Sequence, residues 1–357
     1  MKKHFSKATP ISVVLNLILI INVIIVVYPV LFTISSSLTK SNSLAATSVI
    51  PFTEQTDKST VEMCEACEGK GYRYIDIKSS YEENGKKKTY IGQKLVDCDV
   101  CHGEGEVAVL HTSFKIKKPS LYQFRRLLTG SEQIVKGETT VHGTNYKNWY
   151  LNTLKIAIMN TILTVFICTT TGYIFSRFSF AGRKQIMAGM IVLQMFPSFI
   201  GMVATYVILW KFNALNTLWG LVLVYASGSI PFNAQLMKGY FDTMPRDIAE
   251  AAYIDGASPL VAYLRVILPA AKPQIVFLTL TSFTGPWMDY IFPRMVLRSD
   301  DKKTLAVGLY EMISGRSNDN FTMFAAGAIL VAVPFTIFFM AGQRTLLMSL
   351  AGTSGKE

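Results

Sequence analysis

The chain has 357 residues, of which 50% are hydrophobic and 17% charged, and its formal net charge is +11. Soluble domains carry about 25% charged residues, so this composition excludes an ordinary soluble protein and indicates a membrane protein. The positive charge does not indicate a nucleic-acid-binding protein, because no basic stripe is interleaved with aromatic residues.

Several apolar segments are long enough to cross a bilayer, since a helix needs about 20 residues to span a hydrocarbon core of about 30 Å. They are the segments 11–34, 151–176, 185–210, 216–238, 273–297 and 322–347. Only helices satisfy their own backbone groups in lipid, so we predict an all-α membrane protein with six transmembrane helices. The first segment lacks a clear small-residue cleavage site before Tyr28-Pro29, and we interpret it as a span rather than a cleavable signal peptide.

Basic residues near the ends of these segments fall mainly on one side of the predicted membrane. They are Lys2, Lys3, Lys7, Arg177, Arg183, Lys184, Arg246, Arg265, Lys272, Arg344 and Lys356. Cytoplasmic loops are enriched in Lys and Arg, so we expect this side to be cytoplasmic and both termini to lie there. Lys302 and Lys303, beside Asp300 and Asp301, are a minor exception on the opposite side.

The segments divide the chain into a tail and first span at 1–40, an extracytoplasmic loop at 41–150, a core at 151–350 and a cytoplasmic tail at 351–357. Within the loop, Tyr72–Lys78 and Thr89–Val96 are rich in β-forming residues and flank Asn84-Gly85, which is typical of a tight hairpin turn. We therefore predict a small antiparallel hairpin inside an insert at about 60–110.

Two copies of the pattern CxxCxGxG lie at the two feet of this hairpin and supply Cys64, Cys67, Cys98 and Cys101. Four converging thiolates complete a tetrahedral Zn²⁺ shell, and we predict one structural zinc ion that stabilises an insert too small for much of a core. Disulfides remain an alternative, because the predicted compartment is oxidising. The stretch Cys98–His102 also fits a CxxCH haem-attachment pattern, although the first copy has Glu68 in place of His102.

Polar residues at membrane depth mark either a substrate pathway or hydrogen bonds between helices, and the sequence leaves both readings open. The candidate pathway residues are Gln194, Asn233, Trp287, Asp289 and Tyr290, with Asn16, Asn22, Asn160 and Gln235 as further polar residues in the spans. Asp289 is the strongest candidate because Pro286, two aromatic residues and a carboxylate coincide there; an ion pair with Arg294 or Arg298 is the alternative. Prolines in these spans free carbonyl groups that a neighbour, water or substrate must satisfy.

A polar segment at about 243–270 separates two apolar spans. Its sequence predicts two short helices with a break between them. Asp247 falls in the first turn of the helix that Pro245 opens, and Gly256 favours a left-handed exit. Ser258 and Pro259 fit the cap and first position of the second helix. The small residues Ala251 and Ala252 beside Glu250 allow another protein surface to approach closely.

The order Glu250-Ala251-Ala252, Asp255-Gly256 and Leu268-Pro269 resembles the EAA loop of ABC importer permeases, which seats in a cleft of the ATPase subunit. Other stretches resemble carbohydrate-importer permeases of the MalG type, and the match covers about 1–50 and 119–357. These stretches are Asn152–Leu154, Tyr173–Phe178, Ala181–Arg183, Gln194–Pro197, Leu215–Leu221, Thr304–Leu309 and Leu350–Gly352. The cysteine repeats resemble those of the DnaJ chaperone family, which has four copies where this chain has two.

The resemblance implies half of a heterodimeric pore in the plasma membrane, which imports an oligosaccharide together with a MalF-like permease, an ATPase dimer and an extracytoplasmic solute-binding protein. Glu250 and Gly256 are then the coupling contact. The chain has no phosphate-binding loop and no plausible catalytic triad, so we expect neither bound ATP nor enzymatic activity. Alternatives are a permease for glycerol phosphate or another small polar solute, and a membrane zinc or redox sensor; the EAA-like loop disfavours a secondary transporter.

Overall fold

The computed structural model forms two compact units, one of Met1–Leu44 with Ser120–Glu357 and one of Ala45–Pro119, here called the helical unit and the insert. The structure describes residues 10–40, 50–64, 66–68, 70, 72–83, 86–102, 104, 106–116, 118–135, 138–142, 144–314 and 320–353.

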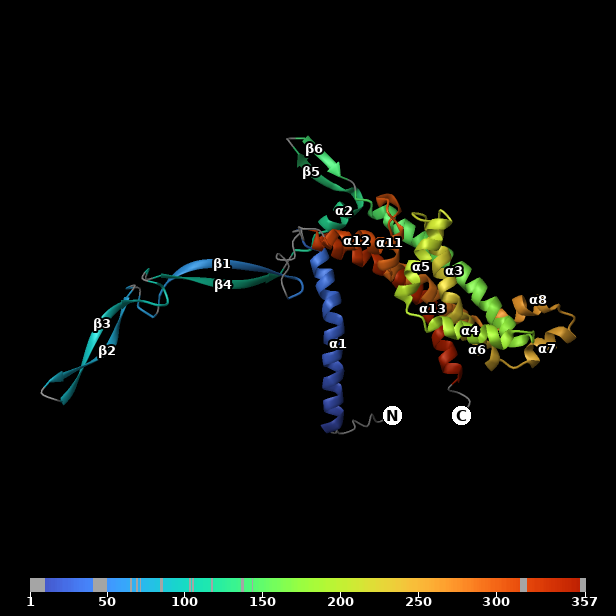
Figure 1. Cartoon of the computed structure of the whole chain (residues 1–357), viewed down its shortest axis with the longest axis horizontal. Coiled ribbons are helices and arrows are strands. Elements are labelled where there is room, and N and C mark those ends of the chain that lie inside the picture. Colours follow the sequence, from blue (N-terminus) through green and yellow to red (C-terminus); the bar gives the residue numbers. More distant parts are fainter. Residues whose placement is uncertain are drawn as a thin grey trace, which may run out of the picture. The chain divides into compact units, whose positions relative to one another are not determined.

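The helical unit is built from helices and one short hairpin (Figure 1). Its helices are α1 (Pro10–Ser37), α2 (Tyr122–Thr129), α3 (Tyr146–Arg177), α4 (Arg183–Gln194), α5 (Ser198–Lys211), α6 (Leu218–Thr243), α7 (Asp247–Ile254), α8 (Pro259–Ala262), a π-helical turn (Tyr263–Ile267), α9 (Leu268–Ala270), α10 (Lys272–Met288), α11 (Ile291–Val296), a 3-10 turn (Asp300–Lys302), α12 (Leu305–Ser314) and α13 (Phe321–Thr353). Between α2 and α3, β5 (Ser131–Val135) pairs antiparallel with β6 (Glu138–His142), a hairpin that the sequence did not predict.

All six predicted apolar segments are largely helical, but six continuous spans are not confirmed. Among the described residues, α1, α3 and α13 are each long and apolar enough to cross a membrane. Helices α4 and α5 meet the criterion only as a pair bent by 106°, and the α8–α9 region with α10 only as a pair bent by 79°. The predicted span 185–210 is broken at Met195–Pro197, because a proline ring cannot continue the helical hydrogen-bond ladder.

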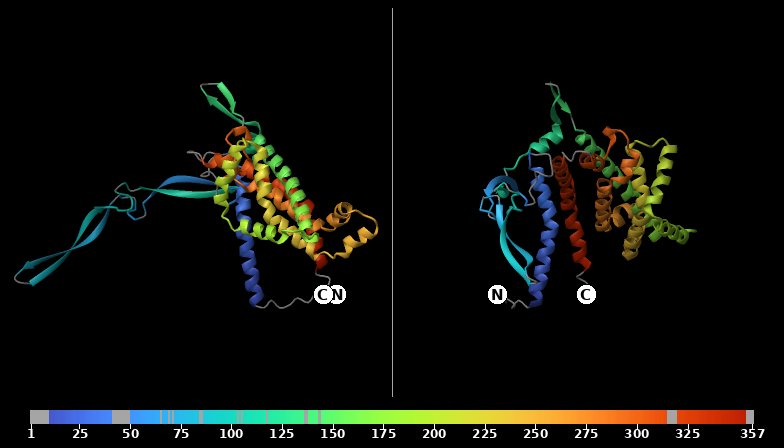
Figure 2. Two further views of the ribbon diagram at one scale, coloured as in Figure 1. Left: turned by 45° about the vertical axis from the view of Figure 1, so that its right-hand side comes forward. Right: turned by 60° about the vertical axis from the view of Figure 1, so that its left-hand side comes forward.

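Helix α3 lies at the centre of the helical unit, alongside α6 and α10 (Figure 2). A close approach between α3 and α6 occurs at Gly172, where an added Cβ would lie 2.6 Å from Cβ of Met237 and 2.9 Å from the backbone nitrogen of Lys238. Helix α13 packs against α10, with the rings of Phe283 and Phe338 stacked at 4.4 Å. Close packing therefore joins α3 to α6 and α10 to α13.

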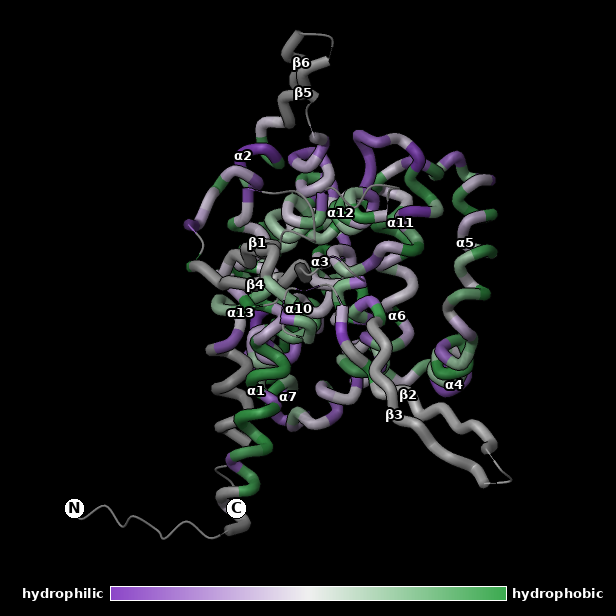
Figure 3. The backbone as a smooth tube through the Cα atoms, turned by 90° about the vertical axis from the view of Figure 1, so that its left-hand side faces the viewer, coloured by the Kyte–Doolittle hydropathy of each residue, from purple (hydrophilic) through white to green (hydrophobic). Residues whose placement is uncertain are grey.

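Helices α2, α11 and α12 lie at one end of the helical unit, here called the α12 end, and α7 and α8 lie at the opposite end (Figures 1 and 2). Figure 3 shows α1 and α5 as hydrophobic over most of their length, in agreement with their large exposed apolar side chains. Such faces suit contact with lipid rather than water.

The insert consists of two antiparallel ladders. Strand β1 (Thr53–Met63) pairs with β4 (Glu106–Ile116), from Thr53 opposite Ile116 to Met63 opposite Glu106. Strand β2 (Tyr72–Glu83) pairs with β3 (Lys86–Asp97). The second pair contains the two predicted strands, although their Asn84-Gly85 turn lies outside the described residues, and the first pair was not predicted.

Candidate functional site

The segment Asp247–Ala270, here called the α7–α9 segment, has the local structure that its sequence predicts. Helix α7 begins at Asp247, two residues after Pro245. Gly256 adopts φ of +82°, which is the left-handed exit expected for glycine. The hydroxyl of Ser258 accepts a hydrogen bond from the backbone N–H of Val261, and Pro259 occupies the first turn of α8.

One side of the α7–α9 segment is open and the other is buried. Glu250, Ala251, Asp255, Gly256 and Pro269 are exposed, and Leu268 is half-buried. Ala252 is 8% exposed and belongs to the interior, so only Ala251 of the two predicted contact alanines is available to another protein. The side chain of Ile254 is 86% exposed and adds an apolar residue that the sequence analysis did not single out.

The buried side of the α7–α9 segment is fixed to α3 by an aromatic pair. The ring of Tyr263 stacks on that of Tyr173 at 4.6 Å. The hydroxyl of Tyr263 donates a hydrogen bond of 3.2 Å to Oγ1 of Thr169. The stacked rings and this hydrogen bond therefore connect the segment to α3.

Arg177, the last residue of α3, holds the adjoining end of α6. Its Nη2 donates hydrogen bonds of 3.0 Å to the carbonyl of Phe241 and 2.9 Å to that of Met244. Phe241 lies in the last turn of α6 and Met244 directly follows the helix, so both bonds are made to carbonyls at its C-terminal end. The guanidinium thus links α3 to the turn that leads into α7.

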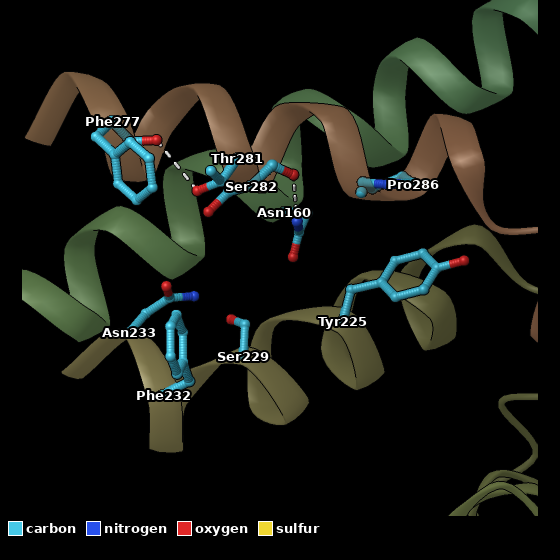
Figure 4. Close-up of a pocket in the computed structure, with 10 residues that line it drawn as sticks. Asn160, Tyr225, Ser229, Phe232, Asn233, Phe277, Thr281, Ser282 and Pro286 are labelled. Atoms are coloured by element: carbon cyan, nitrogen blue, oxygen red, sulfur yellow. Dashed lines mark hydrogen bonds between the residues drawn. The ribbon is translucent and has the colours of Figure 1, made fainter. Parts of the chain in front are cut away.

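A cavity of about 370 Å³ lies between α3, α6 and α10, and we call it the α3–α6–α10 pocket. It is lined by Asn160, Tyr225, Ser229, Phe232, Asn233, Phe277, Thr281, Ser282, Gly285 and Pro286. Figure 4 shows the polar ends of Asn160 and Asn233 turned toward Ser282 across the space, while the ring of Tyr225 points away from it. Amides, hydroxyls and aromatic rings therefore share one small cavity.

A proline determines how Asn160 is oriented in this pocket. Because Pro286 has no N–H, it leaves the carbonyl of Ser282, four residues earlier, without its helical partner. The amide of Asn160 donates a hydrogen bond of 2.8 Å to that carbonyl. Its Oδ1 accepts from Oγ1 of Thr164 at 3.3 Å, so both ends of the amide are assigned.

The five predicted pathway residues do not gather at one place. Asn233 lines the α3–α6–α10 pocket. Gln194 is exposed at the end of α4 and donates to a carbonyl of its own helix, and Trp287 is 4% exposed in an aromatic cluster on α10. Tyr290 packs its ring against Tyr310 at 4.3 Å.

Asp289 sits at the break between α10 and α11, outside the pocket lining, and contacts the hydroxyl of Tyr225. Its Oδ2 accepts a hydrogen bond of 2.9 Å from the hydroxyl of Tyr225, and its Oδ1 accepts from the backbone N–H of Phe292 at 3.3 Å. The alternative ion pairs are not formed, since Arg294 pairs with Glu311 and Arg298 donates to the hydroxyl of Tyr206. Asp289 is thus a capping and positioning carboxylate in this structure.

The sequence analysis missed Ser229 and Ser282 as pocket residues. Serines are common in membrane helices and carry no spacing signal of their own. The position of Ser282 four residues before Pro286 was the available signal, because it identifies the carbonyl that the proline frees.

At the α12 end, polar bonds hold the start of α3 to the loop before α12. Trp149 Nε1 donates to the carbonyl of Asp300 at 2.8 Å. Lys303 donates to Asp300 at 2.8 Å and to Glu311 at 2.6 Å. Burial lowers the pKa of Lys303, but the two carboxylates outweigh it and raise that pKa above its usual value. The loop is thereby fixed to the helices on both sides.

The four cysteines of the two CxxC motifs lie between the two ladders of the insert and form one buried cluster. Their sulfur atoms all lie within 4.8 Å of one another. Cys64 and Cys98 are 3.9 Å apart and Cys67 and Cys101 are 3.6 Å apart, with none in a disulfide. The fifth cysteine, Cys168, is buried alone on α3 among the described residues, as a packing residue.

The two knuckles have matching backbone geometry. Glu68 and His102, each directly after the second cysteine of its copy, have φ of +53° and +52°. Backbone N–H groups of Lys70 and Glu104 bond to the carbonyls of Cys67 and Cys101, each at 3.0 Å. The glycines of the pattern, Gly69, Gly71, Gly103 and Gly105, lie outside the described residues.

The thiols of the cluster differ in acidity. Burial raises the pKa of Cys64 to about 11. Backbone hydrogen bonds from Cys101 and Val100 lower the pKa of Cys98 to about 7. Amides directed at sulfur favour thiolate, which is the form that binds metals. Four cysteines in this arrangement can bind a metal ion.

Comparisons with known proteins place the helical unit in a family. Residues 168–346 match the family described as binding-protein-dependent transport system inner membrane component. The maltodextrin transport system permease protein MdxG of Bacillus subtilis is 42% identical over 214 residues, covering 59% of this chain and 77% of that protein. The galactooligosaccharides transport system permease protein GanQ of the same organism is 34% identical over 250 residues, covering 70% and 85%.

A solved structure has the same fold. The crystal structure of a bacterial ABC transporter involved in the import of the acidic polysaccharide alginate contains a chain that aligns with a TM-score of 0.62 and 18% identity, covering 96% of this chain and 99% of that one. At this identity the match bears on the fold alone. With the family match and the apolar helices, it follows that this chain belongs to the family of binding-protein-dependent transport system inner membrane components and is a multi-pass ABC transporter permease subunit.

Proposed function

We propose that this chain forms half of the translocation pore of an ATP-driven importer of oligosaccharides. The observation that carries the proposal is the exposed Glu250-Ala251 surface of α7, set at one end of a helical unit whose family is that of inner-membrane transport components. The carbohydrate class is supported by the relatives, which are named as permeases for maltodextrin and galactooligosaccharides.

The remaining partners follow from the family and from charge. We expect a second, MalF-like permease, a cytoplasmic ABC ATPase dimer and an extracytoplasmic solute-binding protein, with both termini and the α7–α9 segment on the cytoplasmic side. The basic residues Arg246, Arg265 and Lys272 flank that segment, as positive-inside topology requires. Residues 354–357 of the predicted cytoplasmic tail lie outside the described residues.

The contacts of the α7–α9 segment suggest how ATP hydrolysis drives the helices. The ATPase binds Glu250, Ala251, Asp255 and Gly256, and closure of its dimer moves α7. Tyr263 and Arg177 transmit that movement to α3 and α6, which line the α3–α6–α10 pocket. Rigid displacement of packed helices about a central site is the usual basis of alternating access.

Copurification with a coupling variant tests this proposal. The chain is tagged and extracted in mild detergent, partners are identified by mass spectrometry, and ATPase activity is measured with and without Glu250→Ala. The matched control is Asp247→Asn, which removes an exposed charge from the same helix. We expect a second permease and an ATPase with the wild-type chain and the control, and lost or uncoupled ATPase activity with Glu250→Ala. A chain that purifies without an ATPase contradicts the proposal.

We propose further that the cysteine cluster holds one structural Zn²⁺. A tetrahedral ion with Zn–S bonds of about 2.3 Å separates its sulfur ligands by about 3.8 Å. The separations of 3.6 and 3.9 Å in two of the sulfur pairs bracket this value, and all the pairs lie within 4.8 Å. The buried position of all four sulfurs leaves no open coordination site for catalysis, which favours a structural ion. The ion would tie the end of the β1–β4 ladder to the start of the β2–β3 ladder.

Metal analysis distinguishes zinc from disulfides. We expect about one zinc per chain in the purified complex, and none after all four cysteines are changed to serine. Cys168→Ser is the matched control, since it removes a buried thiol outside the cluster. The alternative predicts no zinc and an intact mass, measured under non-reducing conditions, that is four hydrogens lower than that of the reduced chain. That result would establish two disulfides instead.

A further inference from the structure

The α3–α6–α10 pocket contains polar groups that the protein itself leaves unused. Ser282 is 8% exposed, and its hydroxyl has no hydrogen-bond partner among the described residues. A buried hydroxyl without a partner destabilises the folded protein. Ser282 lines the pocket while its hydroxyl oxygen is buried in the wall, so a turn of this side chain toward the cavity brings the hydroxyl to a ligand.

Further polar groups face the same space from the other helices. The amide of Asn233 on α6 makes no hydrogen bond to another described residue, and it offers both donors and an acceptor. Oδ1 of Asn160 on α3 retains an acceptor position beyond its bond from Thr164. A ligand therefore meets both donors and acceptors, which is what a ring bearing several hydroxyl groups requires.

Aromatic rings form another part of the lining. Phe232 and Phe277 are 59% and 42% exposed, so their faces are free to receive apolar atoms. The C–H faces of a pyranose ring pack on such rings, while its hydroxyls project toward the amides and hydroxyls. The cavity volume of about 370 Å³ is sufficient for a single sugar ring with its hydration.

The lining contains no cation. None of its ten residues is Lys, Arg or His, and none is Asp or Glu. A carboxylate or phosphate that enters a membrane-embedded cavity without a paired cation carries a large desolvation cost. The lining thus distinguishes neutral from anionic sugars.

We infer that the α3–α6–α10 pocket is a subsite for one neutral glycosyl unit, and that this chain, rather than its partner permease alone, excludes uronates and sugar phosphates. The inference rests on the proposed oligosaccharide import and adds to it a location and a charge preference. Asn160, Ser229, Asn233 and Ser282 bind the hydroxyls, and Phe232 and Phe277 bind the ring faces.

The test uses the complete transporter in proteoliposomes with its binding protein. The probes are maltotriose and galactobiose as neutral sugars, an alginate trisaccharide as the acidic one, and glycerol 3-phosphate. Uptake and sugar-stimulated ATPase activity are measured for the wild type, Ser282→Ala, Asn233→Ala and Asn233→Lys. Thr279→Ala is the matched control, because Thr279 lies on α10 outside the pocket and its hydroxyl is bonded to the carbonyl of Ile275.

We expect the wild type to take up a neutral probe and neither anionic probe. Ser282→Ala and Asn233→Ala should each raise the half-saturating concentration of that probe by about 3- to 10-fold, as the loss of one neutral hydrogen bond predicts. Ser282→Ala leaves the melting temperature unchanged or raised, because it removes an unpartnered hydroxyl. Asn233→Lys supplies the missing cation and admits the acidic trisaccharide.

Two results would overturn the inference while leaving the importer intact. One is unchanged neutral uptake in both alanine variants, with ATPase coupling still abolished by Glu250→Ala. The other is wild-type uptake of the acidic trisaccharide in preference to the neutral sugars. Uptake of glycerol 3-phosphate alone overturns both the subsite and the oligosaccharide proposal.

Discussion

The side-chain amide of Asn160 on α3 occupies the hydrogen-bonding position that a backbone N–H would hold toward the carbonyl of Ser282 on α10. The bond of 2.8 Å crosses between helices and exists because Pro286 cannot supply that N–H. The proline inside α10 and the orientation of the pocket amide are therefore linked.

Replacing Asn160 by alanine should destabilise the complex by about 0.6–2 kcal/mol, the range for hydrogen bonds between membrane helices. The loss arises because the Ser282 carbonyl then has no donor. Pro286→Ala restores a backbone N–H to that carbonyl, so the double variant should lose less than the sum of the two single variants. Thermal unfolding of the detergent-purified complex measures all three; strictly additive losses would show that the two residues are not coupled.

Gly172→Ala should separate α3 from α6. The added Cβ would lie 2.6 Å from Cβ of Met237 and 2.9 Å from a backbone nitrogen, and the backbone cannot rotate aside. Overpacking of this kind costs about 1–3 kcal/mol, and we expect a lower melting temperature with reduced uptake. Gly189→Ala is the control, since no atom lies within 4 Å of its added Cβ; equal effects of both changes would refute the explanation by packing.

Gly256→Ala should weaken coupling without any steric clash. An added Cβ at this position meets nothing within 4 Å, so the cost comes only from φ of +82° and amounts to about 1–2 kcal/mol for an L-residue. Gly256→Asn should lose less, because asparagine tolerates this conformation. ATPase retention during purification ranks the variants, and alanine performing as well as asparagine would argue against backbone strain.

Arg177→Lys should be nearly as harmful as Arg177→Ala. Both bonds to the carbonyls of Phe241 and Met244 come from Nη2, which lies one bond farther along the side chain than the ammonium nitrogen of lysine, so lysine does not bring a donor to the same position. We expect ATPase activity that no longer responds to substrate. Arg183→Ala, which removes one bond of 3.3 Å to the carbonyl of Phe178, serves as the control. Full activity of Arg177→Lys would show that charge alone suffices.

Features fixed by neighbouring residues were predictable from the sequence. The left-handed exit at Gly256 and the cap of α8 at Ser258 depend on local backbone preferences, and both are present. The prediction that prolines free carbonyls needing a neighbour is confirmed at Pro286. The broken third span also has a local cause in Pro197, but its 106° bend is not encoded by the proline alone.

Features that join distant residues were not predictable. The bond from Tyr225 to Asp289 and the free hydroxyl of Ser282 depend on how α6 and α10 pack, which no spacing in the sequence specifies. The β1–β4 ladder pairs residues up to 63 positions apart, from Thr53 to Ile116. No tight turn connects these two strands, so no turn motif in the sequence predicts their pairing. The burial of Ala252 similarly follows from packing against the helical unit rather than from residue size.

The chain segments that flank the insert are bonded to each other within the helical unit. The backbone N–H of Ser120 donates to the carbonyl of Leu38 at 3.0 Å, and the amide of Gln123 donates to the carbonyl of Lys40 at 3.1 Å. The insert in turn begins and ends on paired strands, with Thr53 opposite Ile116. An antiparallel module with adjacent ends can be gained or lost in a single genetic event without rerouting the rest of the chain, so permeases with and without this insert can share the same membrane body over evolutionary time.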